Sequence, residues 1–299
     1  MALFVTAAVG RHLGVAPFGL FSSVLALATM LGMASDLGVN RVVVRDLVSG
    51  TTPPGELLGT AFALRAATAA VLAGVGFLVV RWLTFPGEAS AWALAALFGA
   101  AWFLRSAEAV DLGFQAVSRV QYAVLPRVLA LAAGAALQLG LIRAQAGPVA
   151  FGWAAVAEAG LAAVGLLLAW RRWGGTPFTR WRASGERARR LVRESWPLFL
   201  ATLYASVYYK VDLVLLGRLR GDYEAGLYAA SSRIYDIVIG AVPILTVSLF
   251  PVLTRWHQGD PARFRLRYRQ LSQASTLAAL AGLGVLAFFR EPIVGALYG

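Results

Sequence analysis

The sequence contains no cysteine, little charge and almost no histidine or lysine. Charged residues make up 14% of its 299 residues, against about 25% in a typical globular protein. Without cysteine, the chain can form neither a disulfide nor a thiolate metal site. The only histidines, His12 and His257, are expected in separate loops, so no histidine metal site is predicted.

Two further signatures are missing. Lys210 is the only lysine, and no glycine-rich loop of the kind that cradles nucleotide phosphates contains it, so an ATP-driven pump within the chain is not expected. A transmembrane β-barrel needs segments of about ten residues in which polar and apolar side chains alternate, and the Ala, Leu and Gly runs here do not alternate. We expect no cofactor, and the sequence leaves open whether H⁺ or Na⁺ acts as a coupling ion.

Long apolar runs dominate what is present, since 59% of the residues are hydrophobic. Because about 20 apolar residues cross the hydrocarbon core as a helix, each such run predicts a membrane span. The predicted fold class is therefore all-α, a polytopic transmembrane helix bundle. We expect a short helix at 1–10 and spans near 18–39, 57–80, 89–113, 121–142, 149–170, 195–217, 225–250 and 270–289, which is about nine helices in all.

The arginines predict the orientation of these spans. Alternate loops at 40–56, 114–120, 171–193 and 255–269 carry 2, 1, 8 and 5 arginines, whereas the other loops and the carboxyl end carry six. Because short cytoplasmic loops accumulate basic residues, we expect the first set of loops to be cytoplasmic. The net charge of +12 lies largely beside the spans, which favours anionic membrane lipids as partners and not nucleic acid.

A short glycine-containing motif occurs twice. GRHLGVAPFGLF at 10–21 returns as GRLRGDYEAGLY at 217–228, with five identities and an aromatic residue closing both copies. Six predicted spans separate the copies, an even number, so both copies have the same orientation in the membrane. We therefore expect two pseudo-symmetric lobes, with a shortened first helix and an incomplete second lobe. The predicted divisions are a first lobe at 1–171, a basic cytoplasmic linker at 172–193 and the first half of a second lobe at 194–299.

Two segments carry a resemblance to a known family. GRHLGVAPFGLFSSVLALATMLGMASDLGVNRVVVRDL resembles the first loop and second helix of Wzx-type polysaccharide flippases. KVDLVLLGRLRGDYEAGLYAASSRIYDIVIGAVPILTVSLFPVLTR resembles their seventh and eighth helices. These flippases belong to the MATE-like superfamily of multidrug, oligosaccharidyl-lipid and polysaccharide exporters, whose members have two lobes around a central cavity.

The resemblance implies a transporter in the inner (plasma) membrane and not an enzyme. Its cargo would be an undecaprenyl-diphosphate-linked sugar unit, moved from the inner to the outer leaflet for surface polysaccharide biosynthesis. A polysaccharide polymerase and glycosyltransferases would then be its partners. Two alternatives stay open: a MATE-like drug or lipid II exporter, and an integral-membrane glycosyltransferase or ligase. The second is disfavoured by the short outer loops, which leave little room for a catalytic domain.

Charged residues inside the predicted spans are the candidates for function. A charge at the bilayer centre costs about 2.5–3.5 kcal/mol on insertion scales, so such residues face the protein interior or a solvated path. Spacing of three residues predicts local pairs between Arg105 and Glu108 and between Arg233 and Asp236. The full set is Arg65, Arg105, Glu108, Asp111, Arg127, Glu158, Lys210, Asp212, Arg233 and Asp236.

Arg65 and Lys210 stand out because neither has an obvious acidic partner within its own helix turn. Arginine binds phosphate oxygens through two parallel hydrogen bonds, and lysine supplies a compact positive charge. We therefore predict that both face a central cavity and bind a diphosphate headgroup, with no catalytic residue involved. The other predicted cavity charges are Arg105, Arg233 and Asp212.

Overall fold

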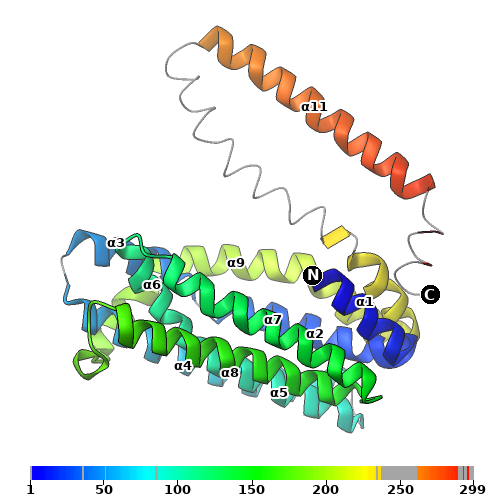
Figure 1. Cartoon of the computed structure of the whole chain (residues 1–299), viewed down its shortest axis with the longest axis horizontal. Helices are drawn as coiled ribbons and strands as arrows, with labels where there is room; N and C mark the ends of the chain where they lie inside the picture. Colours follow the sequence, from blue (N-terminus) through cyan, green and yellow to red (C-terminus); the bar gives the residue numbers. More distant parts are fainter. Residues whose placement is uncertain are drawn as a thin grey trace. The chain divides into compact units, whose positions relative to one another are not determined.

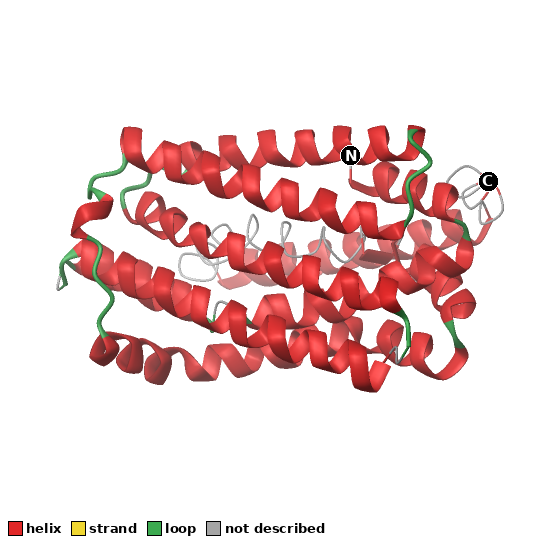
Figure 2. Ribbon diagram, turned by 90° about the horizontal axis from the view of Figure 1, so that it is seen from below, coloured by secondary structure: helices red, strands yellow, loops and turns green. Residues whose placement is uncertain are grey.

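The computed structural model describes residues 2–35, 37–50, 52–84, 87–233, 235–236 and 261–288, with 292 and 295 as isolated positions. All regular elements in these ranges are helices (Figure 1; Figure 2). The chain divides into two compact units. The larger unit comprises Ala2 and residues 12–229, and the other comprises Met1, residues 3–11 and residues 230–299. The predicted all-helical fold is thus confirmed.

The helices of the larger unit follow one another with short connections. The chain begins with α1 (Ala2–Leu13), most of which belongs to the smaller unit, and the smaller unit also contains α11 (Pro261–Phe288). The longer helices of the larger unit are α2 (Val15–Ala34), α4 (Pro54–Leu78), α5 (Ala89–Arg105), α7 (Gln121–Arg143), α8 (Pro148–Trp173) and α9 (Gly185–Arg220). Its shorter elements are α3 (Val39–Ser49), the π-helical turn η1 (Val79–Thr84), the 3₁₀ turn η2 (Ser106–Glu108), α6 (Ala109–Ala116) and the 3₁₀ turn η3 (Phe178–Arg180).

Six helical segments in the described ranges are long and apolar enough to cross a membrane. They coincide with the first six full spans predicted from the sequence, and their bounds are Val15–Ser49, Pro54–Trp82, Ala89–Ala116, Gln121–Arg143, Pro148–Trp173 and Gly185–Arg220. Most of the span predicted at 225–250 lies outside the described residues. The segment predicted at 270–289 overlaps α11 as far as Phe288, and α11 is not among these six.

Helices in the larger unit pack both against their chain neighbours and against helices that are distant in the sequence. Helix α8 packs against α7 and α5, and α4 packs against α5. Helix α2 packs against both α5 and α9, although α9 begins 151 positions after α2 ends. In Figure 1, α4, α5, α7, α8 and α9 lie with their long axes in a similar direction. Charges that are distant in the sequence can therefore meet at one depth of this unit.

One end of the larger unit carries the arginine-rich connections, here called the basic end. The connection at 174–184 lies against the start of α4, where a Cβ atom at Gly59 would lie 2.7 Å from the Arg182 amide nitrogen. The Arg182 amide donates to the Gly55 carbonyl at 3.2 Å, and the Ser184 amide donates to Thr60 Oγ1 at 3.1 Å. Ser184 then caps α9 by accepting from the Arg187 amide at 3.3 Å. The basic connection is thus fixed on the start of α4.

The opposite end carries the two glycine turns, and we call it the glycine end. Gly14 precedes α2 with φ 78° and ψ 169°, and Gly221 follows α9 with φ 89° and ψ 175°. Both conformations have a positive φ, which glycine adopts at little cost. The two copies of the sequence motif therefore share one backbone conformation as well as their residues.

Candidate functional site

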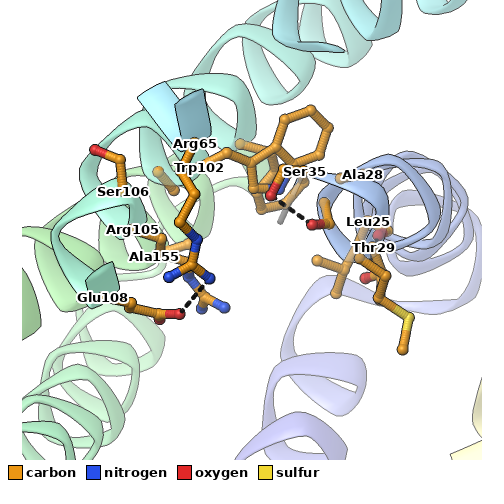
Figure 3. A pocket seen from close by; sticks show the side chains of 14 residues that line it. Leu25, Ala28, Thr29, Ser35, Arg65, Trp102, Arg105, Ser106, Glu108 and Ala155 are labelled. Atoms are coloured by element: carbon orange, nitrogen blue, oxygen red, sulfur yellow. Dashed lines mark hydrogen bonds and ion pairs between the residues drawn. The ribbon is translucent and has the colours of Figure 1, made fainter. Parts of the chain in front are cut away.

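A cavity of about 330 Å³ lies inside the larger unit, between α2, α4 and α5 with a contribution from α8 (Figure 3). One wall is charged and consists of Arg65 from α4, Arg105 from the end of α5 and Glu108 from η2. The opposite wall is α2, where Leu25 and Thr29 lie across the opening from the charged groups in Figure 3. The cavity is thus charged on one side and largely uncharged on the other.

Glu108 is the centre of the charged wall. Its carboxylate lies 3.6 Å from Arg65 Nη2 and 3.9 Å from Arg127 Nη2. The Arg65 side chain is only 11% exposed, whereas the Glu108 side chain is 31% exposed. Both distances exceed those of a hydrogen bond, so Glu108 is shared loosely between two arginines. The local pairing with Arg105 expected from the spacing is not found, because the ion pairs of Glu108 run to other helices.

A second carboxylate extends the charged wall toward the basic end. Asp111 on α6 lies 3.0 Å from Arg127 Nη2 and accepts a hydrogen bond from Gln115 at 3.1 Å. Asp111 Oδ1 and Arg127 Nε are buried and have no hydrogen-bond partner. This cluster of Arg65, Glu108, Arg127 and Asp111, here called the interior cluster, carries no net charge and still has unused hydrogen-bonding capacity.

A third carboxylate lies deeper in the bundle on α8. Glu158 sits against Gly134 of α7, where a Cβ atom would lie 2.7 Å from Glu158 Oε2. Its favourable charge partner is Arg105. Glycine at 134 therefore leaves the space that this carboxylate occupies, and Glu158 balances the charge of Arg105 from α8.

The depths of these groups form a series along the helix axes. At about 1.5 Å per residue, Asp111 and Arg127 lie roughly 8–9 Å from the helix ends at the basic end. Arg65 lies about 16 Å from that end, and Glu158 lies about 22 Å from it. The charges thus run from the inner third of the predicted span to its middle, as residues lining a solvated path would.

The remaining lining residues keep the cavity open without adding charge. Thr29 and Ser35 donate to main-chain carbonyl groups of their own helix, those of Leu25 and Gly32, at 2.7 Å each. At Gly32, a Cβ atom would lie 2.7 Å from Trp102 Nε1. The indole of Trp102 therefore occupies space that a larger residue on α2 would take.

The structure brings together two of the five predicted cavity residues. Arg65 and Arg105 both line the cavity. Lys210 and Asp212 belong to α9, neither lines this cavity, and Asp212 accepts a hydrogen bond from Tyr228. Arg233 lies in the smaller unit and forms the expected local pair with Asp236 at 4.0 Å. The roles of all five residues in substrate binding remain predictions.

Glu108 and Arg127 were not among the five predicted cavity residues. Both belonged to the set of intramembrane charges, in which Glu108 was expected to pair locally with Arg105. A contact between α4 and η2 joins positions 43 residues apart, which no helical spacing can indicate. The signal that could have found Glu108 is its position on a 3₁₀ turn that interrupts a long apolar helix.

Known proteins provide independent comparisons. The family described as "Polysaccharide biosynthesis protein" matches residues 1–257. Among solved structures, the chain is similar to one titled "Inward-facing conformation of a multidrug resistance MATE family transporter of the MOP superfamily". The TM-score is 0.71 at 16% identity, covering 99% of this chain and 71% of that chain. No curated protein matches the chain.

The two findings agree with the membrane-spanning helices and with the resemblance drawn from the sequence. The structural likeness shows a MATE-like transporter fold in a multi-pass membrane protein. The family match covers well over half of the 299 residues. The chain therefore belongs to the polysaccharide biosynthesis protein family.

Proposed function

We propose that the protein is a flippase that moves an undecaprenyl-diphosphate-linked sugar unit from the inner to the outer leaflet of the plasma membrane. The observation that carries the proposal is the cavity wall on which Arg65 and Arg105 face the opening beside a single carboxylate, Glu108. Two guanidinium groups lie at the cavity surface, and although Glu158 is a further charge partner of Arg105 on α8, arginine forks match the oxygens of a diphosphate. The series of charges from the basic end supports entry from the cytoplasmic leaflet.

The proposed mechanism uses charge and involves no bond breaking. The headgroup replaces Glu108 as the partner of Arg65, which is a small change because the existing pair is 3.6 Å apart. Lys210 does not line this cavity, and in the proposed scheme it adds a cationic group on α9, the helix that the sequence repeat assigns to the second lobe. The lobes then rock about the bound headgroup and expose it to the other side. Glycosyltransferases would supply the cargo and a polymerase would consume it. Coupling of transport to H⁺ or Na⁺ is compatible with this scheme.

Substitution of the two cations tests the proposal. Arg65→Ala and Lys210→Ala should each lower delivery of lipid-linked sugar to the outer leaflet by about tenfold or more, since each removes a charge-assisted contact of about 1.5–3 kcal/mol. Membrane abundance should fall much less than delivery. Arg143→Ala, at an exposed arginine of the opposite end, is the matched control and should deliver normally. Normal delivery by both variants would refute the assignment.

A drug or lipid II exporter is the competing function, and the solved structure of similar fold carries a multidrug title. The two candidates differ in the sign of the cargo. A cation exporter would depend on Glu108 and tolerate loss of Arg65, whereas a flippase for an anionic lipid requires Arg65. Comparing Glu108→Gln with Arg65→Ala in delivery and in drug-efflux assays therefore separates them.

Orientation is the second requirement of the proposal, because the basic end must face the cytoplasm. The protein has no cysteine, so single introduced cysteines report without background. Gly175 in the basic connection and Gly147 before α8 both have open space around them, and they lie at opposite ends of the larger unit. In intact cells an impermeant thiol reagent should label Gly147→Cys and spare Gly175→Cys. The reverse pattern would overturn the orientation.

A further inference from the structure

The two copies of the glycine motif touch each other at the glycine end. A Cβ atom at Gly19 would overlap the carbonyl oxygen of Asp222 and would lie 2.7 Å from the amide nitrogen of Gly226. A Cβ atom at Gly226 would overlap the carbonyl oxygen of Val15 and lie 3.0 Å from its carbonyl carbon. Only glycine at both positions permits this approach of one backbone to another.

The contact is reciprocal with respect to the repeat. Gly19 and Gly226 occupy the same slot in the two copies, separated by 207 positions, and so do Val15 and Asp222. Each glycine therefore meets the carbonyl group of the other copy's equivalent residue. Reciprocal contacts of this kind are produced by a two-fold axis, which the repeat predicts along the membrane normal.

The aromatic residues that close the two copies attach them to different helices. Phe21 packs edge-on against Phe98 of α5 and Phe151 of α8, with ring centroids 5.9 and 6.4 Å apart. Its counterpart Tyr228 donates a hydrogen bond to Asp212 of α9. The first copy is thus anchored on helices of the predicted first lobe, and the second copy on the first helix of the predicted second lobe. At the glycine end, the two groups meet at the glycine contact.

We propose that Gly19 and Gly226 form the outer gate of the transporter, closed in this structure. This inference rests on the proposed transport function, although its test does not require a cargo. The contact is made mainly by backbone groups, with the Val15 side chain beside Gly226, where its Cγ1 atom would lie 3.0 Å from a Cβ atom. Such a contact excludes water when it is closed, and because it is made mainly by backbone groups, the two copies can part with little repacking.

A thiol reporter in the cavity tests the gate. Thr29 lines the cavity, ten residues along α2 from Gly19, or about 15 Å. In intact cells Thr29→Cys should react slowly with an impermeant reagent added from outside. Adding Gly19→Leu or Gly226→Leu should prevent closure and raise the labelling rate by about tenfold. Gly140→Leu is the matched control, because Gly140 also lies in a helix near this end and has open space around it.

Each outcome decides the proposal. Faster labelling with the leucine variants and no change with Gly140→Leu supports the gate, whatever their effect on sugar delivery. Unchanged labelling in folded leucine variants overturns it. If the leucine variants do not accumulate, Gly19→Ala and Gly226→Ala replace them and are judged by the same labelling rate. Failure of these alanine variants to accumulate, beside a normal Gly140→Leu, would show a fixed packing contact and would also overturn the gate.

Discussion

The molecule contains two clusters with the same composition in different surroundings. The interior cluster consists of Arg65, Arg127, Glu108 and Asp111. A second cluster, here called the basic-end cluster, joins α3 to the start of α9. It also has two arginines, a glutamate and an aspartate, namely Arg45, Arg190, Glu194 and Asp46. In each cluster a glutamate is shared by both arginines.

The ion pairs of the basic-end cluster are shorter than those of the interior cluster, yet we expect them to contribute less to stability. Glu194 lies 2.6 Å from Arg45 and 2.7 Å from Arg190, and both arginine side chains are more than half exposed. Glu108 lies 3.6 and 3.9 Å from its arginines. Exposed pairs contribute little because water solvates the separated charges equally well. Less solvated pairs cost more to break even when they are loose, because each partner is left without compensation.

The comparison indicates why the interior cluster, with its longer ion pairs, is the functional candidate. The basic-end cluster fixes α9 to α3 through short ion pairs, and of its four members only Arg190 lines a cavity in the described part of the chain, an open one of about 1030 Å³ along the start of α9. The interior cluster borders a cavity and includes polar atoms without partners, Asp111 Oδ1 and Arg127 Nε. Its arginines can therefore accept an additional anionic partner at modest cost.

The largest expected effect is at Asp111. Its side chain is 10% exposed and its Arg127 partner is 39% exposed, so Asp111→Ala leaves a partly buried cation with only the loose Glu108 contact at 3.9 Å. We expect a loss of about 2–3 kcal/mol, below the 3–5 kcal/mol typical of a fully buried pair. The melting temperature of the purified protein in detergent should fall by roughly 5–10 °C.

A double variant serves as the control for this prediction. Asp111→Ala combined with Arg127→Leu removes both charges, so more than half of the lost melting temperature should return. If Asp111→Ala lowers the melting temperature no more than a variant of the basic-end cluster does, the interior cluster is solvated like the basic-end cluster and the comparison fails.

An intermediate effect is expected at Glu108. Glu108→Gln keeps the shape of the side chain but leaves Arg65 and Arg127 with less negative charge nearby, so the ligand-free protein should melt a few degrees lower. Inorganic diphosphate should then stabilise this variant more than it stabilises the wild type, because the anion no longer competes with a carboxylate. The measurement is the melting temperature with and without diphosphate. Equal diphosphate shifts in both proteins would contradict binding at the interior cluster.

Much of the fold could be predicted from the sequence, because a membrane-spanning helix is recognised from the apolar residues of its own segment. The predicted segment 121–142 corresponds to α7 at Gln121–Arg143, and 149–170 corresponds to α8 at Pro148–Trp173. The start of α9 was less predictable, since residues 185–193 were assigned to a linker and form its first turns. These residues are charged and are also good helix formers, so hydropathy detects only the apolar remainder of the helix.

The site was predictable only in part. The energetic cost of a charge at membrane depth singled out Arg65 and Arg105, and both line the same cavity, because a buried charge requires a solvated or paired environment. The partners were not predictable, since spacing within one helix favoured Arg105 and Glu108 whereas the fold pairs Glu108 with Arg65 of α4 and Arg127 of α7. The basic-end cluster was missed because it lies outside the predicted spans, and only charges inside those spans were considered as candidates.

The smallest effect is expected at Glu194, and it would sharpen the comparison most directly. Glu194→Gln is the counterpart of Glu108→Gln, since each removes the charge of a glutamate shared by two arginines. Because Arg45 and Arg190 are exposed, water can solvate them once the carboxylate is lost, and the melting temperature should fall by less than about 2 °C. The Debye length falls to about 3 Å at 1 M salt, so this small difference in melting temperature should shrink in 1 M NaCl. The deficit of Glu108→Gln should persist in the same buffer, because its cluster is less accessible to ions. A salt-independent loss at Glu194 as large as that at Glu108 would mean that distance and not solvation determines what these clusters contribute.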